Sequence, residues 1–289
     1  MLGAGASLAL LVSAIGFAPA AAQEMAAAET PVAIPAESYD IAGTLALPAA
    51  AEGPVPAVLM LHGYGSSADE VGGMYAGLAE SLAAQGIGSL RIDFAGMGAS
   101  EASTLDYTWD SQIADAATAL DWLIGQESVD GERVGVQGFS LGSMIGSHLV
   151  GTDPRAAAFG SWSGAIYNGD QGWYIPSIEE CEATGEDHLE LDLGWRMLDH
   201  SCDFFTSMAA STALDDFAPY ANPLLLVVGA DDESVDPAVS ANAATASESA
   251  DVTLETIGGA DHIYHVFDED QALADEVITK TADWYAENL

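Results

Sequence analysis

A serine flanked by glycines carries the clearest chemical signal in this sequence of 289 residues. Ser140 lies between Gly138 and Gly142 in the pattern Gly-x-Ser-x-Gly, after a strand-like run at 133–137 and before a helical pattern at 141–150. Glycine has no Cβ, so the pattern suits a sharp turn at which a strand and a helix pass closely. Such a turn would hold the Ser140 hydroxyl above a sheet as a nucleophile, at the positive end of the following helix.

A serine hydroxyl is a poor nucleophile unless a base accepts its proton, and the base needs an acid to orient it. Candidates for both roles follow later apolar runs. Asp231 and Asp232 come after the run at 224–228, and His262 follows the run at 252–257. The chain order serine, acid, histidine is typical of hydrolases whose nucleophile lies on a strand-to-helix turn.

The elements that must position these residues alternate along the chain. Strand-like runs lie at 39–48, 55–61, 87–92, 133–137, 156–159, 224–228 and 252–257, and helical patterns at 70–84, 109–125, 141–150 and 271–287. Strands that alternate with helices predict an α/β fold with a mostly parallel central sheet flanked by helices.

Three further segments carry a resemblance to a known family: 43–48, 61–65 and 93–100. With the Gly-x-Ser-x-Gly turn, they make the chain similar to the α/β-hydrolase superfamily over about 38–287. More narrowly, it resembles the serine carboxylesterase and feruloyl-esterase-like branch, which is related to prolyl-oligopeptidase and dienelactone-hydrolase-like enzymes.

The resemblance implies a role for each candidate. Ser140 would be the nucleophile, His262 the general base and then acid, and Asp232 the triad acid. The backbone N–H groups of Tyr64 and Leu141 would form the oxyanion hole. The resemblance implies neither a metal nor an organic cofactor.

Two of these residues have close competitors. Asp232 stands three residues after Gly229, which ends a strand-like run, and the family places its acid there; Asp231 remains the alternative. His265 competes with His262, but the short turn at 258–261 favours His262.

The charge balance restricts the partners. The chain has 45 acidic and 5 basic residues, a formal net charge of −40 at pH 7. Nucleic acid is excluded because binding to phosphates needs many Lys and Arg side chains, and an anionic membrane surface is unfavourable for the same reason. Self-repulsion on this scale is best tolerated where salt screens it, so we expect a salt-adapted protein; a merely acidic, very soluble protein is the alternative.

The first 22 residues are typical of a secretory signal, with an apolar stretch at 8–17 and small residues at 20–22. An N-terminal apolar anchor is the alternative. We expect a flexible leader over 23–37, the hydrolase domain over 38–289, and a secreted or periplasmic location. Residues at about 166–218 interrupt the strand and helix alternation, which predicts an inserted cap.

Both cysteines, Cys181 and Cys202, fall in this insertion. In an exported chain they could form a disulfide, and the alternative is two buried thiols. Trp173, Tyr174 and Trp195 are candidates to line a substrate pocket, although they could equally hold the cap together.

His62 is a further pocket candidate, but a residue there more often braces the oxyanion loop. His188 and His200 lie among acidic residues and could hold a divalent ion, but their irregular spacing favours a solvated surface. The sequence thus predicts hydrolysis of a small-molecule or polymer-derived ester, with no cofactor. The alternatives are a serine peptidase or amidase of the same fold and a binding protein that lost turnover.

Overall fold

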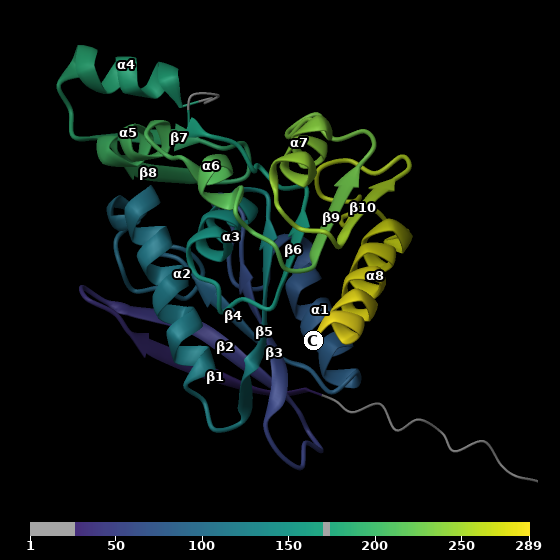
Figure 1. Ribbon diagram of the computed structural model, residues 1–289. Coiled ribbons are helices and arrows are strands. Elements are labelled where there is room, and N and C mark those ends of the chain that lie inside the picture. Colours follow the sequence, from purple (N-terminus) through teal and green to yellow (C-terminus); the bar gives the residue numbers. More distant parts are fainter. Residues whose placement is uncertain (1–26, 170–173) are drawn as a thin grey trace, which may run out of the picture.

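The computed structural model describes residues 27–169 and 174–289, and its centre is an eight-stranded sheet with the order β1-β2-β4-β3-β5-β6-β9-β10 (Figure 1). The strands are β1 (Ala27–Pro35), β2 (Asp40–Pro48), β3 (Val55–Leu61), β4 (Gly88–Asp93), β5 (Val129–Phe139), β6 (Ala158–Trp162), β9 (Leu224–Gly229) and β10 (Val252–Ile257). Strand β2 is antiparallel to β1 and β4, and all other neighbours are parallel. The predicted fold class, a mostly parallel sheet flanked by helices, is confirmed.

Helices cover both faces of the sheet and bury a separate apolar core on each. Helices α1 (Met74–Ala84) and α8 (Ala272–Asn288) pack together on one face. The other face carries α2 (Trp109–Ile124), α3 (Leu141–Thr152), α6 (Ala213–Phe217) and α7 (Ala238–Ala246). None of the helices in the described parts of the chain combines the length and apolar character that a membrane span requires.

The first strand corrects one prediction. We expected a flexible leader over 23–37, but residues 27–35 form β1 and pair along their whole length with β2. Pro31 and Pro35 are tolerated because β1 lies at the edge of the sheet, where only one side of a strand needs hydrogen bonds. Ile34 is fully buried and anchors the strand in the core. The predicted signal segment, 1–22, lies outside the described residues.

The chain between β6 and β9 leaves the sheet and builds a small cap, defined here as residues 174–209. It contains α4 (Ile175–Thr184), the two antiparallel strands β7 (His188–Asp192) and β8 (Met197–Ser201), and α5 (Cys202–Ala209). Figure 1 shows the cap beyond the ends to which the arrows of β6 and β9 point. A disulfide joins Cys181 of α4 to Cys202 of α5, with the two Cα atoms 6.1 Å apart.

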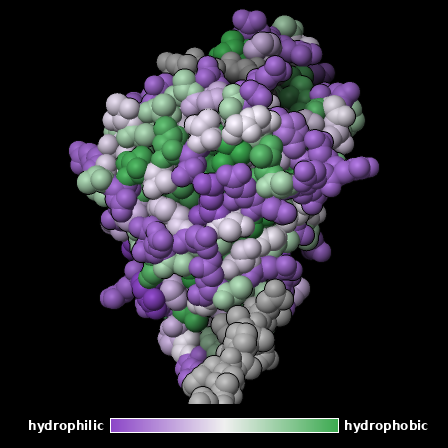
Figure 2. All heavy atoms as spheres, turned by 90° about the vertical axis from the view of Figure 1, so that its right-hand side faces the viewer, coloured by the Kyte–Doolittle hydropathy of each residue, from purple (hydrophilic) through white to green (hydrophobic). Residues whose placement is uncertain are grey.

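The surface reflects the acidic composition. Figure 2, which faces the side of α8 and β10, shows hydrophilic side chains over much of the surface, with smaller apolar groups between them. This face of the molecule is therefore mostly polar.

Candidate active site

Ser140 occupies a strained turn between β5 and α3. Its backbone has φ 51° and ψ −117°, a conformation that a side chain with a Cβ rarely adopts. The flanking glycines are needed because a Cβ at Gly142 would overlap the carbonyl group of Leu61, and one at Gly138 would overlap the backbone of Ser143. The strain is thus held by close backbone packing, as the Gly-x-Ser-x-Gly pattern predicts.

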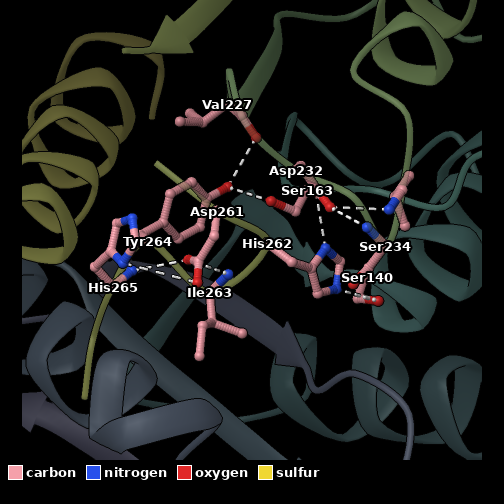
Figure 3. A network of polar contacts seen from close by, with 11 residues as sticks. Ser140, Ser163, Val227, Asp232, Ser234, Asp261, His262, Ile263, Tyr264 and His265 are labelled. Carbon is pink, nitrogen blue, oxygen red and sulfur yellow. Dashed lines mark hydrogen bonds and ion pairs between the residues drawn. The ribbon is translucent and has the colours of Figure 1, made fainter. Parts of the chain in front are cut away.

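His262 joins Ser140 to Asp232 in one chain of hydrogen bonds (Figure 3). Its Nε2 atom lies 3.1 Å from Ser140 Oγ, and its Nδ1 atom lies 2.8 Å from Asp232 Oδ2. The three residues are far apart in the chain but follow β5, β9 and β10, parallel strands whose carboxyl ends meet at one edge of the sheet. A hydroxyl, an imidazole and a carboxylate in this arrangement can transfer a proton away from serine.

Asp232, rather than Asp231, is the acid next to the imidazole. Its side chain is buried, whereas Asp231 is exposed. Oδ1 of Asp232 accepts hydrogen bonds from the amides of Ser234 and Val235, at 2.8 and 2.9 Å. Burial by itself raises the pKa of Asp232, but the hydrogen bonds from His262 and the two amides outweigh it and leave this pKa below the usual range.

His265 takes no part in this chain. Its Nε2–H donates to the carbonyl of Gly259, and its Nδ1 faces Asp261 and Asp268. Figure 3 shows its ring on the side of Tyr264 away from Ser140. The structure therefore assigns the contact with serine to His262.

Comparison with known proteins agrees with this fold. A family described as the alpha/beta hydrolase fold matches residues 56–159. The computed structure superposes on Est1E of Butyrivibrio proteoclasticus bound to ferulic acid with a TM-score of 0.71 and 20% identity, covering 89% of this chain and 99% of that one. The esterase domain of a Rhodothermus marinus protein gives a TM-score of 0.66 and 19% identity, covering 90% and 98%. The match to that family thus covers residues 56–159, and over most of its length the chain shares the fold of these solved structures.

A curated protein also matches this chain in sequence over part of its length. The polyketide transferase ATR5 of Stachybotrys chlorohalonatus (strain IBT 40285) is 32% identical over 104 residues. The match covers 36% of this chain and 34% of that protein, about a third of each.

The loop at 62–65 directly follows β3 and lies beside the start of α3. The two are so close that a Cβ at Gly142 would overlap the carbonyl oxygen of His62. Leu141 is the first residue of α3, so its N–H has no acceptor within the helix. The Gly63 N–H donates to Oε2 of Glu70 at 2.6 Å, and the Val71 N–H donates to Oε1 of the same carboxyl at 2.9 Å. Burial raises the pKa of Glu70 to about 7.

Glu70 therefore fixes the loop that carries Tyr64, and no pattern in the sequence marks it for this role. A Glu in so acidic a chain is usually a surface residue, and only the burial of its side chain distinguishes Glu70 from the others.

His62 is wrong as a candidate for direct contact with substrate. Its side chain is fully buried, and both ring nitrogens have hydrogen-bond partners within the protein. Nδ1–H donates to the carbonyl of Gly63 at 2.8 Å, and Nε2 accepts from the N–H of Phe94 at 3.1 Å. Burial lowers the pKa of His62, so the ring stays neutral and braces the 62–65 loop.

The other pocket candidates separate into different environments. Tyr174 is fully buried and donates its hydroxyl to the carbonyl of Gly169, so it holds the cap together rather than lining a pocket. Trp195 is 70% exposed, and its ring lies near Gly65. Trp173 lies outside the described residues. Trp195 therefore remains as the candidate at the edge of the 62–65 loop.

The two histidines considered for a metal site lie at adjacent positions of the paired strands β7 and β8 but in different environments. His188 is exposed beside Asp187, whereas His200 is fully buried, stacks on Phe204 and contacts the Tyr64 hydroxyl through Nε2. Burial lowers the pKa of His200 to about 4. Within residues 27–169 and 174–289, no group of three or more His, Cys, Asp or Glu side chains has an arrangement that could hold a metal ion.

Proposed function

We propose that this chain hydrolyses carboxylic esters through an acyl-enzyme formed on Ser140. The observation that supports this most directly is the imidazole of His262, which lies within hydrogen-bond distance of both the Ser140 hydroxyl and the Asp232 carboxylate. The fold supports hydrolase chemistry in general, and the ester as substrate is our proposal.

In the first step, Ser140 Oγ attacks the ester carbonyl while its proton moves to Nε2 of His262. Asp232 accepts the Nδ1–H, which fixes the tautomer and stabilises the positive charge that forms on the ring. The carbonyl oxygen becomes an oxyanion, which the N–H groups of Leu141 and Tyr64 would bind. Collapse of the adduct breaks the bond to the alcohol, and His262 returns the proton to the alcohol oxygen.

In the second step, a water molecule attacks the acyl carbon and gives its proton to His262. The tetrahedral adduct then breaks its bond to Ser140 Oγ, which takes the proton back. The products are one alcohol and one carboxylic acid, and the three side chains regain their starting protonation states.

Replacement of the nucleophile tests this proposal. Ser140→Ala should lower kcat on a p-nitrophenyl ester by about 10³- to 10⁶-fold, because the variant has no atom to acylate. A fluorophosphonate should label the wild-type protein at Ser140 and leave the variant unlabelled. Ser249→Ala, on the loop that precedes β10, is the matched control and should retain activity. Normal turnover by Ser140→Ala would refute the proposal.

Two alternative functions use the same measurements. A serine peptidase or amidase would cleave an amide as well as the ester of the same acyl group, so paired substrates distinguish it. A binding protein on this scaffold would neither turn over an ester nor react with the fluorophosphonate. The strained, partly accessible Ser140 favours a catalytic protein over a binding protein.

We also propose which esters are candidate substrates. Est1E, which has a similar fold, is described with bound ferulic acid, and this motivates hydroxycinnamate esters as candidates. A series of methyl esters of rising chain length, with methyl ferulate included, would rank acyl groups by kcat/KM. A preference for short alkyl esters over methyl ferulate would remove the feruloyl-esterase assignment.

Export and salt adaptation are also proposed, from the first 22 residues and the net charge of −40. Salt shortens the range of self-repulsion from about 10 Å at 0.1 M to about 3 Å at 1 M. The melting temperature should therefore rise between about 0.1 and 2 M NaCl. If the melting temperature did not change with salt, the proposal of salt adaptation would be refuted and the protein would be merely acidic.

A further inference from the structure

The basic residues of this chain are few, and all but one have acidic partners. The paired cations are Arg91 with Glu29 and Asp69, Arg133 with Asp130, Arg155 with Asp121 and Asp153, and Lys280 with Glu255 and Glu276. Arg196 forms no ion pair in the parts of the chain that the structure describes, although 45 acidic residues are available. In so acidic a protein, a guanidinium without a carboxylate is the exception that needs a physical reason.

Arg196 contacts the loop that we assign to the oxyanion. It belongs to the turn between β7 and β8 in the cap, and its Nη1 donates to the carbonyl of Gly65 at 3.2 Å. Gly65 directly follows Tyr64, whose N–H we assign to the oxyanion. The guanidinium therefore contacts the residue next to the one whose N–H would bind the oxyanion.

Much of the guanidinium is still available for a ligand. Nη1 also lies 3.6 Å from Met97 Sδ, but Nε and Nη2 make no hydrogen bond to any residue that the structure describes. These N–H groups form the planar edge that matches two carboxylate oxygens. Trp195 and Met197, both exposed, flank Arg196 in the chain and provide apolar surface for the rest of a ligand.

The surroundings of Arg196 do not neutralise its charge. The side chain is half-buried, and the titratable groups that sense it are the phenol of Tyr107 and the imidazoles of His62 and His200. The two imidazoles are neutral, since burial and then the charge of Arg196 keep the pKa of His200 at about 4. A half-desolvated cation with neutral neighbours gains most from an anion that arrives with the ligand.

We propose that Arg196 binds a carboxylate on the substrate, so that the preferred ester carries an acidic group a few bonds from the bond that is cleaved. The inference rests on the proposed ester hydrolysis and names its substrate class. Two parallel hydrogen bonds from Nε and Nη2 to the carboxylate would orient the ester carbonyl over Ser140. The net charge of −40 repels such a substrate at long range, so a local cation is required to hold it.

Paired substrates test this inference. Monomethyl glutarate and methyl pentanoate share one chain length and differ only in the terminal carboxylate. Arg196→Gln should lower kcat/KM for monomethyl glutarate by about 10- to 100-fold, mainly through KM, and change it for methyl pentanoate by less than about threefold. Arg196→Lys should restore part of the loss, because Lys keeps the charge without the planar fork.

The control is Arg133→Gln, which changes the net charge equally but lies outside the cap, where Arg133 pairs with Asp130 and donates to the carbonyl of Leu289. It should leave the ratio of the two substrates unchanged. Equal losses on both esters in Arg196→Gln would show that Arg196 only fastens the cap to Gly65, and would overturn the inference.

A binding measurement separates this inference from the proposed function. In the inactive Ser140→Ala background, calorimetry should detect monomethyl glutarate with Arg196 present, and at least about tenfold weaker binding after Arg196→Gln. Equal binding by the two proteins would refute the role of Arg196. If the wild-type protein hydrolysed no ester, the proposed function would be refuted. The calorimetry would still decide whether Arg196 binds a carboxylate, because it does not depend on turnover.

Discussion

The edge of the sheet that carries Ser140 and the cap that lies next to it are built in different ways. Ser140, Asp232 and His262 each follow a core strand, and their backbone is fixed by strand pairing and by glycines that admit no side chain. The cap has two short strands, two short helices and one disulfide, and its contact with the 62–65 loop depends on side chains. In our proposal, the chemistry therefore lies on the part that backbone pairing fixes, and substrate selection lies on the part that side-chain contacts hold.

Of the predictions that test this comparison, we expect the largest effect, a loss of kcat, from replacing Asp232. Asp232→Asn should lower kcat by about 10⁴-fold with little change in melting temperature, because the amide would favour the wrong tautomer of His262. Asp231→Asn is the matched control, since Asp231 is adjacent but exposed, and it should retain nearly full activity. Steady-state kinetics on one ester compares kcat for the two variants. A larger loss of kcat in Asp231→Asn than in Asp232→Asn would make Asp231 the triad acid.

The next effect concerns the cap alone. Replacing Cys181 and Cys202 with Ser opens a loop with a sequence separation of 21, and the chain-entropy estimate for such a loop is about 3 kcal/mol. The loss should fall on the cap, so limited proteolysis should cut within 174–209 much faster, and the same should hold for the reduced wild-type protein. Hydrolysis of a small ester should change by less than about tenfold. Complete loss of that activity would show that the cap and the sheet edge unfold together.

A pH-dependent effect belongs to the loop between the two regions. Burial raises the pKa of Glu70 to about 7, so the folded protein keeps a proton there that the unfolded chain releases above its ordinary pKa of 4.5. Stability is therefore lost as pH rises from 5 to 8, by up to about 3 kcal/mol. Glu70→Gln carries no such charge, and its urea midpoint relative to wild type should rise over this window. A difference independent of pH would show that the carboxyl is already ionised at pH 5.

The residues on the sheet edge were predictable from sequence because backbone geometry leaves a signature there. Glycines at 138 and 142 and at the end of the run at 224–228 mark where strands stop, and the reactive side chains follow within a few residues. The edge strand β1 was missed because its two prolines and its alanines are typical of a leader, although Thr30, Val32 and Ile34 alternate as in a strand.

The cap residues were not predictable in the same way, because their roles depend on packing between segments far apart in the chain. Nothing in the sequence distinguishes buried Tyr174 from exposed Trp195, and nothing marks Glu70 as buried. Whether Arg196 has an acidic partner likewise depends on which residues surround it in the folded protein. The sequence was therefore enough to predict the candidate catalytic residues. The structure was needed to identify the side chains that surround them.

The smallest expected effect lies where the two regions touch. The Tyr64 hydroxyl meets Nε2 of His200, a ring that is buried in the cap and whose Nδ1 has no hydrogen-bond partner in the described residues. Tyr64→Phe keeps the backbone N–H that we assign to the oxyanion and removes only the hydroxyl. We expect a loss of about 1 kcal/mol in stability and a fall in kcat/KM of less than about tenfold, with faster proteolysis of the cap.

Tyr39→Phe is the matched control, since Tyr39 lies outside the cap, between β1 and β2, and its hydroxyl donates to Asp115 of α2. It should cost similar stability without exposing the cap to protease. If Tyr64→Phe instead lowered kcat by more than about 10³-fold, as removal of an oxyanion donor can, the hydroxyl itself would act on the reacting ester. The cap would then be part of the catalytic machinery, and the division between a rigid chemical edge and a separate selecting cap would not hold.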